Sequence, residues 1–391
     1  MKQRISLLFP FIFFTISILQ AQPFSVAYQD AEYVDSERAD RVVNARIFYP
    51  SNQAGEAWPF AEGTFPVIVF AHGFVMPYTA YNLYWESFVA EGYVVVMLDT
   101  ETGISPSHQD YALDMVFLVE KLQAESLLED SPFYQKLNGL SAVMGHSMGG
   151  GASFLAIKNS SAIQTMVTLA AAETNPGAIA AASEIEQPSL VIAGSIDCVT
   201  APADHQLPMY NALISDSKTY IDIIGGTHCQ FASQSSVCEL GELFCEEAGL
   251  SREEQLAISI QFALLWFNFH LKNQCEAAQA FQSLLATNSS ISYQQSEELL
   301  CLGSLIFPNS REPLRIKAFP NPSTSQTSLS FNRPLYNGKI SIINQQGIEV
   351  HSRTKINGNR ILLSHEDWSA GLYHIFVEHE NERATQSLFI Y

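Results

Sequence analysis

Residues 140–153 read Leu-Ser-Ala-Val-Met-Gly-His-Ser-Met-Gly-Gly-Gly-Ala-Ser, and this stretch decides the fold. Its first five residues are mostly apolar, as in a buried strand, and small residues open a helical pattern after Gly149. A strand, a tight glycine-flanked turn and a helix in this order expose a serine hydroxyl on a strained backbone. The stretch therefore predicts that Ser147 is a nucleophile, with a helix N-cap as the alternative role for this serine.

The chain on both sides of this stretch alternates short apolar runs with longer segments of helical period. This alternation is typical of a mostly parallel sheet covered by helices, so an α/β fold is predicted. The predicted strands are residues 66–70, 93–98, 140–144, 165–169, 189–193 and 218–224. The predicted helices are residues 81–90, 111–124, 151–159, 204–213 and 253–271.

A serine hydroxyl needs a base within hydrogen-bond reach and a third group that orients the base. In sites of this kind the chain order is nucleophile, acid, histidine. Asp197 follows the predicted strand at residues 189–193, and His228 follows the strand at 218–224. Because strand ends converge at the carboxyl edge of an open α/β sheet, we predict that these two residues form a Ser-His-Asp triad with Ser147.

Other acids and histidines in this region have simpler explanations. Asp204 lies where an N-cap is expected, and Asp222 lies inside a predicted strand. His205 adjoins the same helix start as Asp204, and His270 falls in a mostly aromatic helix. A turn aspartate and a surface histidine remain the alternative roles for the two predicted triad partners.

Cleavage of an ester also requires donors for the oxyanion of the tetrahedral intermediate, usually two backbone N–H groups. One is expected from Met148, the residue after the nucleophile, and the second from the loop after an early strand. Ala71-His72-Gly73-Phe74 forms that loop, and the N–H of Phe74 is the predicted second donor. His72 is predicted to order the loop, with a role as a second base as the alternative.

The N-terminus has the pattern of an export signal. Lys2 and Arg4 precede an apolar run at residues 5–19, and Leu19-Gln20-Ala21 fits a small-residue cleavage site. We therefore predict a signal peptide at residues 1–21 and a secreted or cell-surface protein. A buried first helix or a membrane anchor is the alternative, but the run is shorter than the ~20 residues that a spanning helix needs. No later segment is apolar enough to span a bilayer.

The charge balance argues against several partners. The 391 residues include 40 acidic and 20 basic side chains, and the formal net charge is −20. Such a surface repels phosphate backbones and anionic lipids, so no nucleic-acid partner is predicted. Six cysteines in an exported chain suggest up to three disulfides. A zinc site is the alternative, but the cysteine spacings do not fit zinc ribbons, and no metal or cofactor is predicted.

The pattern changes after the predicted catalytic domain, residues 22–275. Residues 276–315 mix polar residues with two short helical stretches and end in several prolines, which predicts a linker or capping segment. The runs that follow have period two and are separated by glycine turns. They predict a small antiparallel β-sandwich at residues 316–391.

From about residue 61 to residue 271 the chain resembles the α/β-hydrolase superfamily. Within this superfamily, the chain most resembles one branch. That branch contains cutinases, polyester hydrolases that act on PET, chlorophyllases and platelet-activating-factor acetylhydrolase-like esterases. It lies in residues 145–151, 193–202 and 225–228. It implies an α/β-hydrolase fold and a serine carboxylic ester hydrolase without a cofactor, using the triad and the oxyanion donors named above.

In the polyester hydrolases a disulfide links the acid loop to the histidine loop. Cys198 and Cys229 directly follow the predicted acid and histidine, so the resemblance implies a disulfide between them, with two buried thiols as the alternative. The segment at residues 233–250, which contains Cys238 and Cys245, is longer than the resemblance leads us to expect.

The end of the chain resembles the C-terminal sorting domain of proteins exported through the bacterial type IX secretion system. The points of similarity are Phe319-Pro320-Asn321-Pro322, Gly338-Lys339 before a strand, Ala370-Gly371-Leu372-Tyr373 and a strand at the C-terminus. The resemblance implies export via the periplasm, with the secretion machinery as a partner. An ordinary accessory module, such as a carbohydrate-binding one, is the alternative.

An ester or a polyester is thus the predicted substrate. A lipase or a peptidase would use the same triad, but a lipase usually adds a long apolar lid, and residues 170–189 contain none. A non-catalytic surface-binding protein on this fold would normally have lost a triad member, whereas all three candidates are present.

Overall fold

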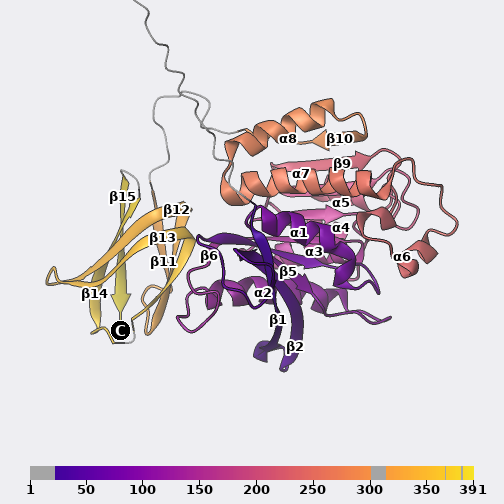
Figure 1. Ribbon diagram of the computed structural model, residues 1–391. Coiled ribbons are helices and arrows are strands. Elements are labelled where there is room, and N and C mark those ends of the chain that lie inside the picture. The colour runs from indigo at the N-terminus through magenta and orange to yellow at the C-terminus, as the bar shows by residue number, and fades with distance from the viewer. Residues whose placement is uncertain (1–22, 301–313, 366, 380–381) are drawn as a thin grey trace, which may run out of the picture.

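The computed structural model describes residues 23–300, 314–365, 367–379 and 382–391. A larger α/β domain is followed by a smaller all-β domain (Figure 1). The predicted signal peptide lies outside the described residues. In the described part of the chain, no helix is both long enough and apolar enough to cross a membrane.

A mostly parallel sheet forms the centre of the larger domain. Its strand order is β10-β9-β8-β7-β6-β4-β5-β2-β1-β3, and β4 to β9 run parallel to one another. All six strands predicted from the sequence are present and form this parallel centre. The strands are β1 (Ser25–Asp35), β2 (Arg41–Ser51), β3 (Gly55–Glu56), β4 (Phe65–Ala71), β5 (Val94–Leu98), β6 (Leu137–His146), β7 (Thr165–Leu169), β8 (Ser189–Gly194), β9 (Lys218–Ile223) and β10 (Ile291–Gln295).

The continuous apolar runs arise because the sheet is buried on both faces. In β4, Val67 and Val69 pack into one hydrophobic core, while Ile68 and Phe70 pack into the other. Every residue of this strand is buried. The central strands therefore lack the alternation of apolar and polar residues that a half-exposed sheet would show.

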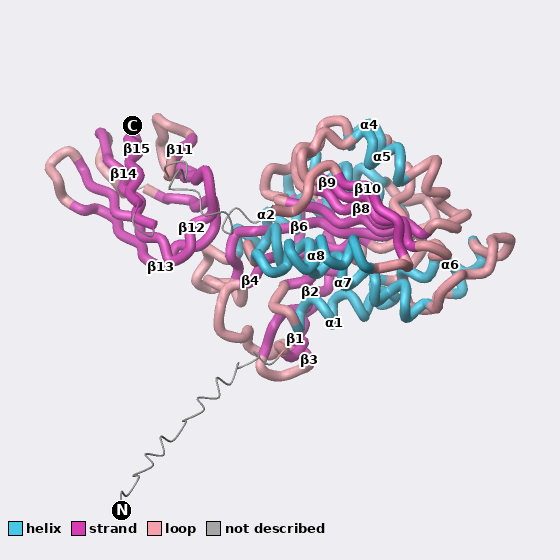
Figure 2. The backbone as a smooth tube through the Cα atoms, turned by 90° about the horizontal axis from the view of Figure 1, so that it is seen from above, coloured by secondary structure: helices cyan, strands magenta, loops and turns pink. Residues whose placement is uncertain are grey.

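Helices cover both faces of the sheet (Figure 2). One face carries α2 (His108–Glu125), α3 (Met148–Asn159), α4 (Ala178–Ala182) and α5 (Gln206–Ala212). The other carries α1 (Asn82–Ala90), α7 (Arg252–Lys272) and α8 (Cys275–Thr287). The short α6 (Ser236–Gly241) and the 3-10 turns Ser36–Arg38, Tyr78–Tyr81 and Cys229–Phe231 lie in connecting loops. This arrangement confirms the predicted α/β-hydrolase fold.

The larger domain extends beyond the predicted boundary at residue 275. Helix α8 packs on α7 through a contact between Phe281 and Trp266, whose ring centroids are 5.6 Å apart. Strand β10 pairs antiparallel with β9 and forms the edge of the main sheet. The predicted linker or capping segment at residues 276–315 therefore begins with a helix and a strand that pack on the larger domain. An exposed edge strand of mostly polar residues, such as Ser292 and Gln294, gives little strand signal in the sequence.

The smaller domain is an antiparallel sheet with its own hydrophobic core, as predicted. Two of the period-two runs in this part of the sequence, residues 328–331 and 339–343, are parts of one long strand, β12. Register shifts in its middle let its first part pair with β11 and its second part with β14, while β13 pairs along both. The strands are β11 (Ile316–Phe319), β12 (Gln326–Asn344), β13 (Glu349–Ser364), β14 (Gly371–His379) and β15 (Glu382–Ile390).

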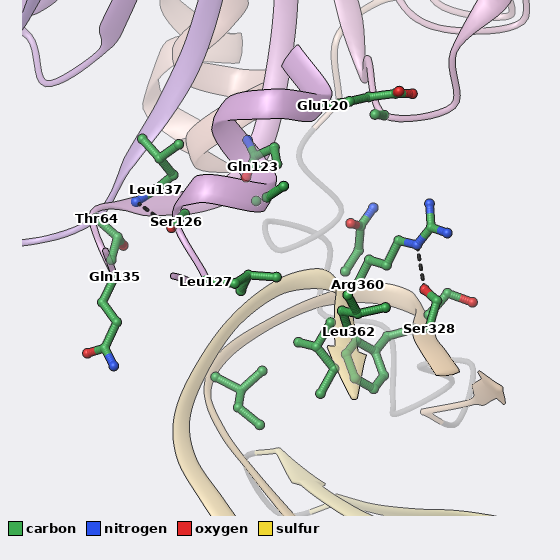
Figure 3. Close-up of a pocket in the computed structure, with 18 of the residues that line it drawn as sticks. Thr64, Glu120, Gln123, Ser126, Leu127, Gln135, Leu137, Ser328, Arg360 and Leu362 are labelled. Atoms are coloured by element: carbon green, nitrogen blue, oxygen red, sulfur yellow. Dashed lines mark hydrogen bonds between the residues drawn. The ribbon is translucent and has the colours of Figure 1, made fainter. Parts of the chain in front are cut away.

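The two domains meet at the amino end of β6. Gly358 of β13 lies so close to β6 that an added Cβ atom would be 2.7 Å from the Asn138 carbonyl oxygen. Beside this contact is an open crevice of about 1170 Å³, lined by Glu120 and Gln123 on one side and by Arg360 on the other (Figure 3). None of the predicted catalytic residues lines it.

Candidate active site

Ser147 lies on a sharp turn between β6 and α3. Its backbone has φ 55° and ψ −117°, a strained conformation for a residue with a side chain. Hydrogen bonds on both sides hold the turn, since the Ser147 N–H donates to Leu169 O at 2.9 Å and its carbonyl accepts from Ala172 N at 2.9 Å. The Ser147 side chain does not cap α3. Ser147 therefore occupies the N-cap position of α3 without a capping hydrogen bond from its side chain.

Two glycines make this turn sterically possible. A Cβ atom on Gly145 would lie 2.3 Å from the backbone of Gly149, and one on Gly149 would lie 2.1 Å from the Ala71 carbonyl oxygen. Real side chains never approach so closely, so both positions require glycine. The second contact brings the start of α3 directly against the loop that follows β4.

The structure brings Ser147, His228 and Asp197 together at the carboxyl edge of the sheet. The His228 Nε2 atom lies 2.9 Å from Ser147 Oγ, and His228 Nδ1 lies 2.7 Å from Asp197 Oδ2. A carboxylate only accepts hydrogen bonds, so Nδ1 carries the proton and Nε2 accepts from the serine hydroxyl. His228 and Asp197 are both buried.

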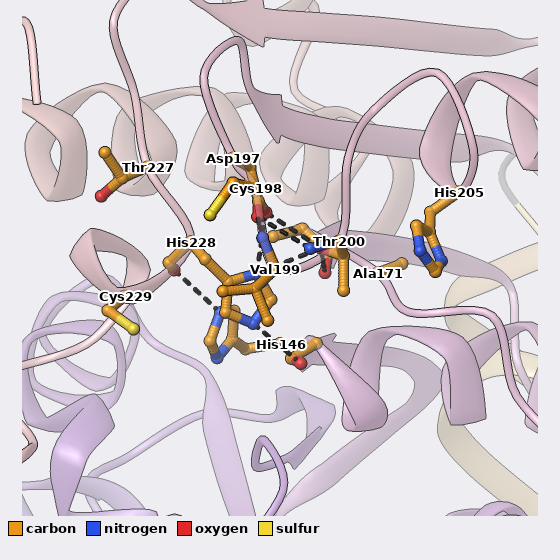
Figure 4. A network of polar contacts seen from close by, with 12 residues as sticks. His146, Ala171, Asp197, Cys198, Val199, Thr200, His205, Thr227, His228 and Cys229 are labelled. Atoms are coloured by element: carbon orange, nitrogen blue, oxygen red, sulfur yellow. Dashed lines mark hydrogen bonds and ion pairs between the residues drawn. The ribbon is translucent and has the colours of Figure 1, made fainter. Parts of the chain in front are cut away.

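The acid is held by its own loop. Asp197 Oδ1 accepts hydrogen bonds from the backbone N–H groups of Val199 and Thr200, both at 2.8 Å. Asp197 Oδ2 is therefore the oxygen that faces His228 (Figure 4). A second contact to Oδ2 comes from the Thr200 hydroxyl at 2.9 Å, and no pattern in the sequence predicts it.

The rival acids and histidines lie in other surroundings. His205 Nδ1 accepts from the Glu173 N–H at 2.9 Å. Asp222 lies within β9, where burial raises its pKa to about 6. His270 packs on Trp266, and burial lowers its pKa to about 3. None of the three contacts the triad.

The two predicted oxyanion donors lie on segments that touch. Met148 begins α3, and Phe74 lies in the loop after β4, which contacts Gly149. Among the described residues, neither the Phe74 nor the Met148 N–H donates a hydrogen bond to any acceptor. Phe74 is 48% exposed, so this loop carries an apolar ring at the surface.

Two buried histidines support the site without belonging to the triad. The His72 ring lies within hydrogen-bond distance of the Gly73 and Thr100 carbonyl oxygens, at 2.8 and 3.0 Å, which fits its predicted role in ordering the loop. His146 Nε2 donates to the His228 carbonyl oxygen at 3.1 Å, and its Nδ1 accepts from the Tyr81 hydroxyl at 2.9 Å. Burial, together with the neighbouring His228, holds the pKa of His146 well below its usual value.

The predicted disulfide between Cys198 and Cys229 is wrong. Cys198 pairs with Cys245, and Cys229 pairs with Cys238, with Cα atoms 5.7 Å apart in each pair. The reason is the segment at residues 233–250, which folds back over both loops and brings a cysteine to each of them. Its contact with the histidine loop is reinforced by Glu242, whose Oε1 accepts from the Cys229 N–H at 2.8 Å. The acid and histidine loops are therefore linked through this segment.

This pairing predicts a specific peptide map. We expect proteolysis of the unreduced protein to yield a peptide pair joined at Cys198–Cys245 and another joined at Cys229–Cys238, as identified by mass spectrometry. In the chain-entropy picture, the 47-residue separation of the first pair is worth roughly 4 kcal/mol and the 9-residue separation of the second roughly 2.5 kcal/mol. The variant C198S/C245S should therefore lower the melting temperature more than C229S/C238S. A Cys198–Cys229 peptide would contradict the structure.

The arrangement is a complete set of parts for acyl transfer: a nucleophile, a base, an orienting acid and free N–H donors. Residues 18–245, more than half of the chain, match the model of a family described as PET hydrolase-like. The chain belongs to this family. Among the described residues, no group of histidine, cysteine, aspartate and glutamate side chains is arranged to hold a metal ion.

Characterised relatives agree with the family. Cutinase 2 of Thermobifida cellulosilytica is 26% identical over 222 residues, which cover 55% of this chain and 76% of that protein. Cutinase cut1 of Thermobifida fusca is also 26% identical, over 55% of this chain and 62% of that protein. A bis(hydroxyethyl) terephthalate hydrolase of Streptomyces coelicolor is 25% identical over 46% of this chain and 54% of its own length.

The C-terminal domain matches a different family from the one that the catalytic domain matches. Residues 317–391 match a secretion system C-terminal sorting domain, which confirms the resemblance drawn from the sequence. With this domain attached to a PET hydrolase-like domain, the chain is a secreted or cell-surface protein.

Proposed function

We propose that this protein is a serine carboxylic ester hydrolase that acts through Ser147, His228 and Asp197. The observation that carries the proposal is the unbroken row of short contacts from Ser147 Oγ to His228 to Asp197, at 2.9 and 2.7 Å, beginning on a strained turn. The cutinases and the terephthalate ester hydrolase among its relatives support the same class of reaction.

The reaction follows from the positions of the groups. His228 Nε2 takes the hydroxyl proton while Ser147 Oγ attacks the ester carbonyl carbon, and Asp197 stabilises the resulting imidazolium. The N–H groups of Phe74 and Met148 bind the oxyanion. His228 then gives its proton to the departing alcohol, which leaves an acyl-enzyme. Water, activated by the same histidine, releases the acid and restores the serine.

The narrower substrate proposal is a polyester with aromatic or aliphatic acid units. Phe74 and Val199 are 48% and 40% exposed; Phe74 is the predicted oxyanion donor after β4, and Val199 lies two residues after Asp197 in the acid loop. Apolar surface of this kind suits an uncharged acyl group, whereas the strongly acidic chain disfavours an anionic one. For the C-terminal domain, we propose recognition by the type IX secretion machinery, as its relatives' description as sorting domains suggests.

The test is hydrolysis of p-nitrophenyl esters from C2 to C12 by the protein without its predicted signal peptide. We expect activity on the short esters without added metal or cofactor, and release of soluble acid from an amorphous polyester film. A folded protein that is inert on every ester would refute the proposed reaction. Activity on soluble esters with none on films would refute only the polyester proposal.

A further inference from the structure

Thr200 occupies an unusual position behind the triad. It is buried, three residues after Asp197, at the point where the acid loop passes the end of β7. Its Oγ1 atom lies 2.9 Å from Asp197 Oδ2 and 3.1 Å from His228 Nδ1. The hydroxyl therefore touches both partners of the hydrogen bond that orients the catalytic base (Figure 4).

Two further contacts hold this hydroxyl in place. Thr200 Oγ1 lies 3.0 Å from the Ala170 carbonyl oxygen and 3.2 Å from Gln206 Nε2. Gln206 is fully buried at the start of α5, and its amide also donates to Ala171 O at 2.6 Å. The threonine is thus fixed by two segments other than its own loop.

The hydroxyl has one proton and two acceptors for it. Gln206 Nε2 is a donor, and the His228 Nδ1 proton is directed at Asp197 Oδ2, so neither of these groups can take the threonine proton. The Ala170 carbonyl and Asp197 Oδ2 remain as acceptors. Rotation about the Thr200 Cβ–Oγ1 bond turns the hydroxyl proton from the neutral Ala170 carbonyl to the Asp197 carboxylate.

We propose that Thr200 is a positioning residue, whose hydroxyl fixes Asp197 Oδ2 against His228 and donates to that oxygen as the imidazolium forms. Without the hydroxyl, His228 is the only hydrogen-bond partner of Asp197 Oδ2 among the residues that the structure describes. Hydrogen bonds to charged groups are stronger than neutral ones, so the contact gains value as charge develops. This inference rests on the proposed esterase function.

The test compares Thr200→Val, which keeps the side-chain shape, with Thr200→Ser, which keeps the hydroxyl. On a soluble p-nitrophenyl ester we expect Thr200→Val to lower kcat at least about tenfold, with KM within about twofold of wild type. The rate at which a fluorophosphonate labels Ser147 should fall in parallel. Thr200→Ser should recover most of both rates. If Thr200→Val does not fold, Thr200→Ala replaces it in the comparison with Thr200→Ser.

The matched control is Thr168→Val on β7. Thr168 is also buried, and its Oγ1 has no hydrogen-bond partner among the described residues, so this variant should keep wild-type kcat. Equal loss of kcat in Thr200→Val and Thr200→Ser would overturn the inference, because the lost feature would then be packing. Wild-type activity in Thr200→Val would also overturn it. An inert wild-type protein would instead refute the proposed function.

Discussion

Replacement of Ser147 by alanine is expected to lower kcat on p-nitrophenyl esters by at least roughly 10⁴-fold, because the attacking oxygen is lost while the rest of the site remains. The side chain makes no helix cap, and its only described side-chain hydrogen bond is to His228. Stability should therefore change little. The measurement is initial rate at saturating ester, beside a thermal unfolding curve of the same preparation.

The control for this variant is Ser183→Ala. Ser183 is exposed after α4 and donates only to Ala180 O, so activity should stay at the wild-type level. A fluorophosphonate should add one phosphonyl group per wild-type molecule, at Ser147. It should add none to Ser147→Ala, as mass spectrometry of the intact protein would show. Substantial activity in a folded Ser147→Ala protein would show that another residue attacks the ester.

Replacement of Asp197 by asparagine is expected to lower kcat about 10⁴-fold for a different reason. Two backbone N–H groups point at Oδ1, so the asparagine carbonyl must take that position and its NH2 group must face His228. The imidazole then has to accept at Nδ1 and carry its proton on Nε2. In that tautomer it cannot take the proton of Ser147.

The matched control is Asp204→Asn, which changes a nearby carboxylate that does not contact His228. The Asp204→Asn variant should keep wild-type kcat. This result would show that Asp197→Asn acts by changing the His228 tautomer and not by removing a negative charge from the acid loop. Comparable activity in wild type and Asp197→Asn would contradict the assignment of the acid. Loss of activity in Asp204→Asn alone would point to that residue instead.

Much of the site could be predicted because its determinants are local in the sequence. The turn at Ser147 is specified by Gly145 and Gly149, which lie two residues before and two residues after the serine. Asp197 lies three residues after the end of β8, and His228 lies five residues after the end of β9, so the topology of a parallel sheet was enough to bring them together.

The errors concern features set by distant parts of the chain. The disulfide pairing depends on how residues 233–250 fold back over two loops, which no local pattern encodes. The hydrogen bonds of the Thr200 hydroxyl to Gln206 and to Ala170 arise only in the folded chain, so no sequence pattern indicates them. Strand β10 is short and polar on its exposed side, and only its pairing with β9 makes it a strand.

The contact between the two domains determines which way the enzyme faces. The C-terminal domain touches the amino end of β6, while Ser147 follows its carboxyl end, about 30 Å away along the 10 residues of that strand. A molecule held at the outer surface of a cell by its last domain would direct its catalytic edge toward the medium. The proposed nucleophile, Ser147, would then lie on the side of the molecule away from the point of attachment.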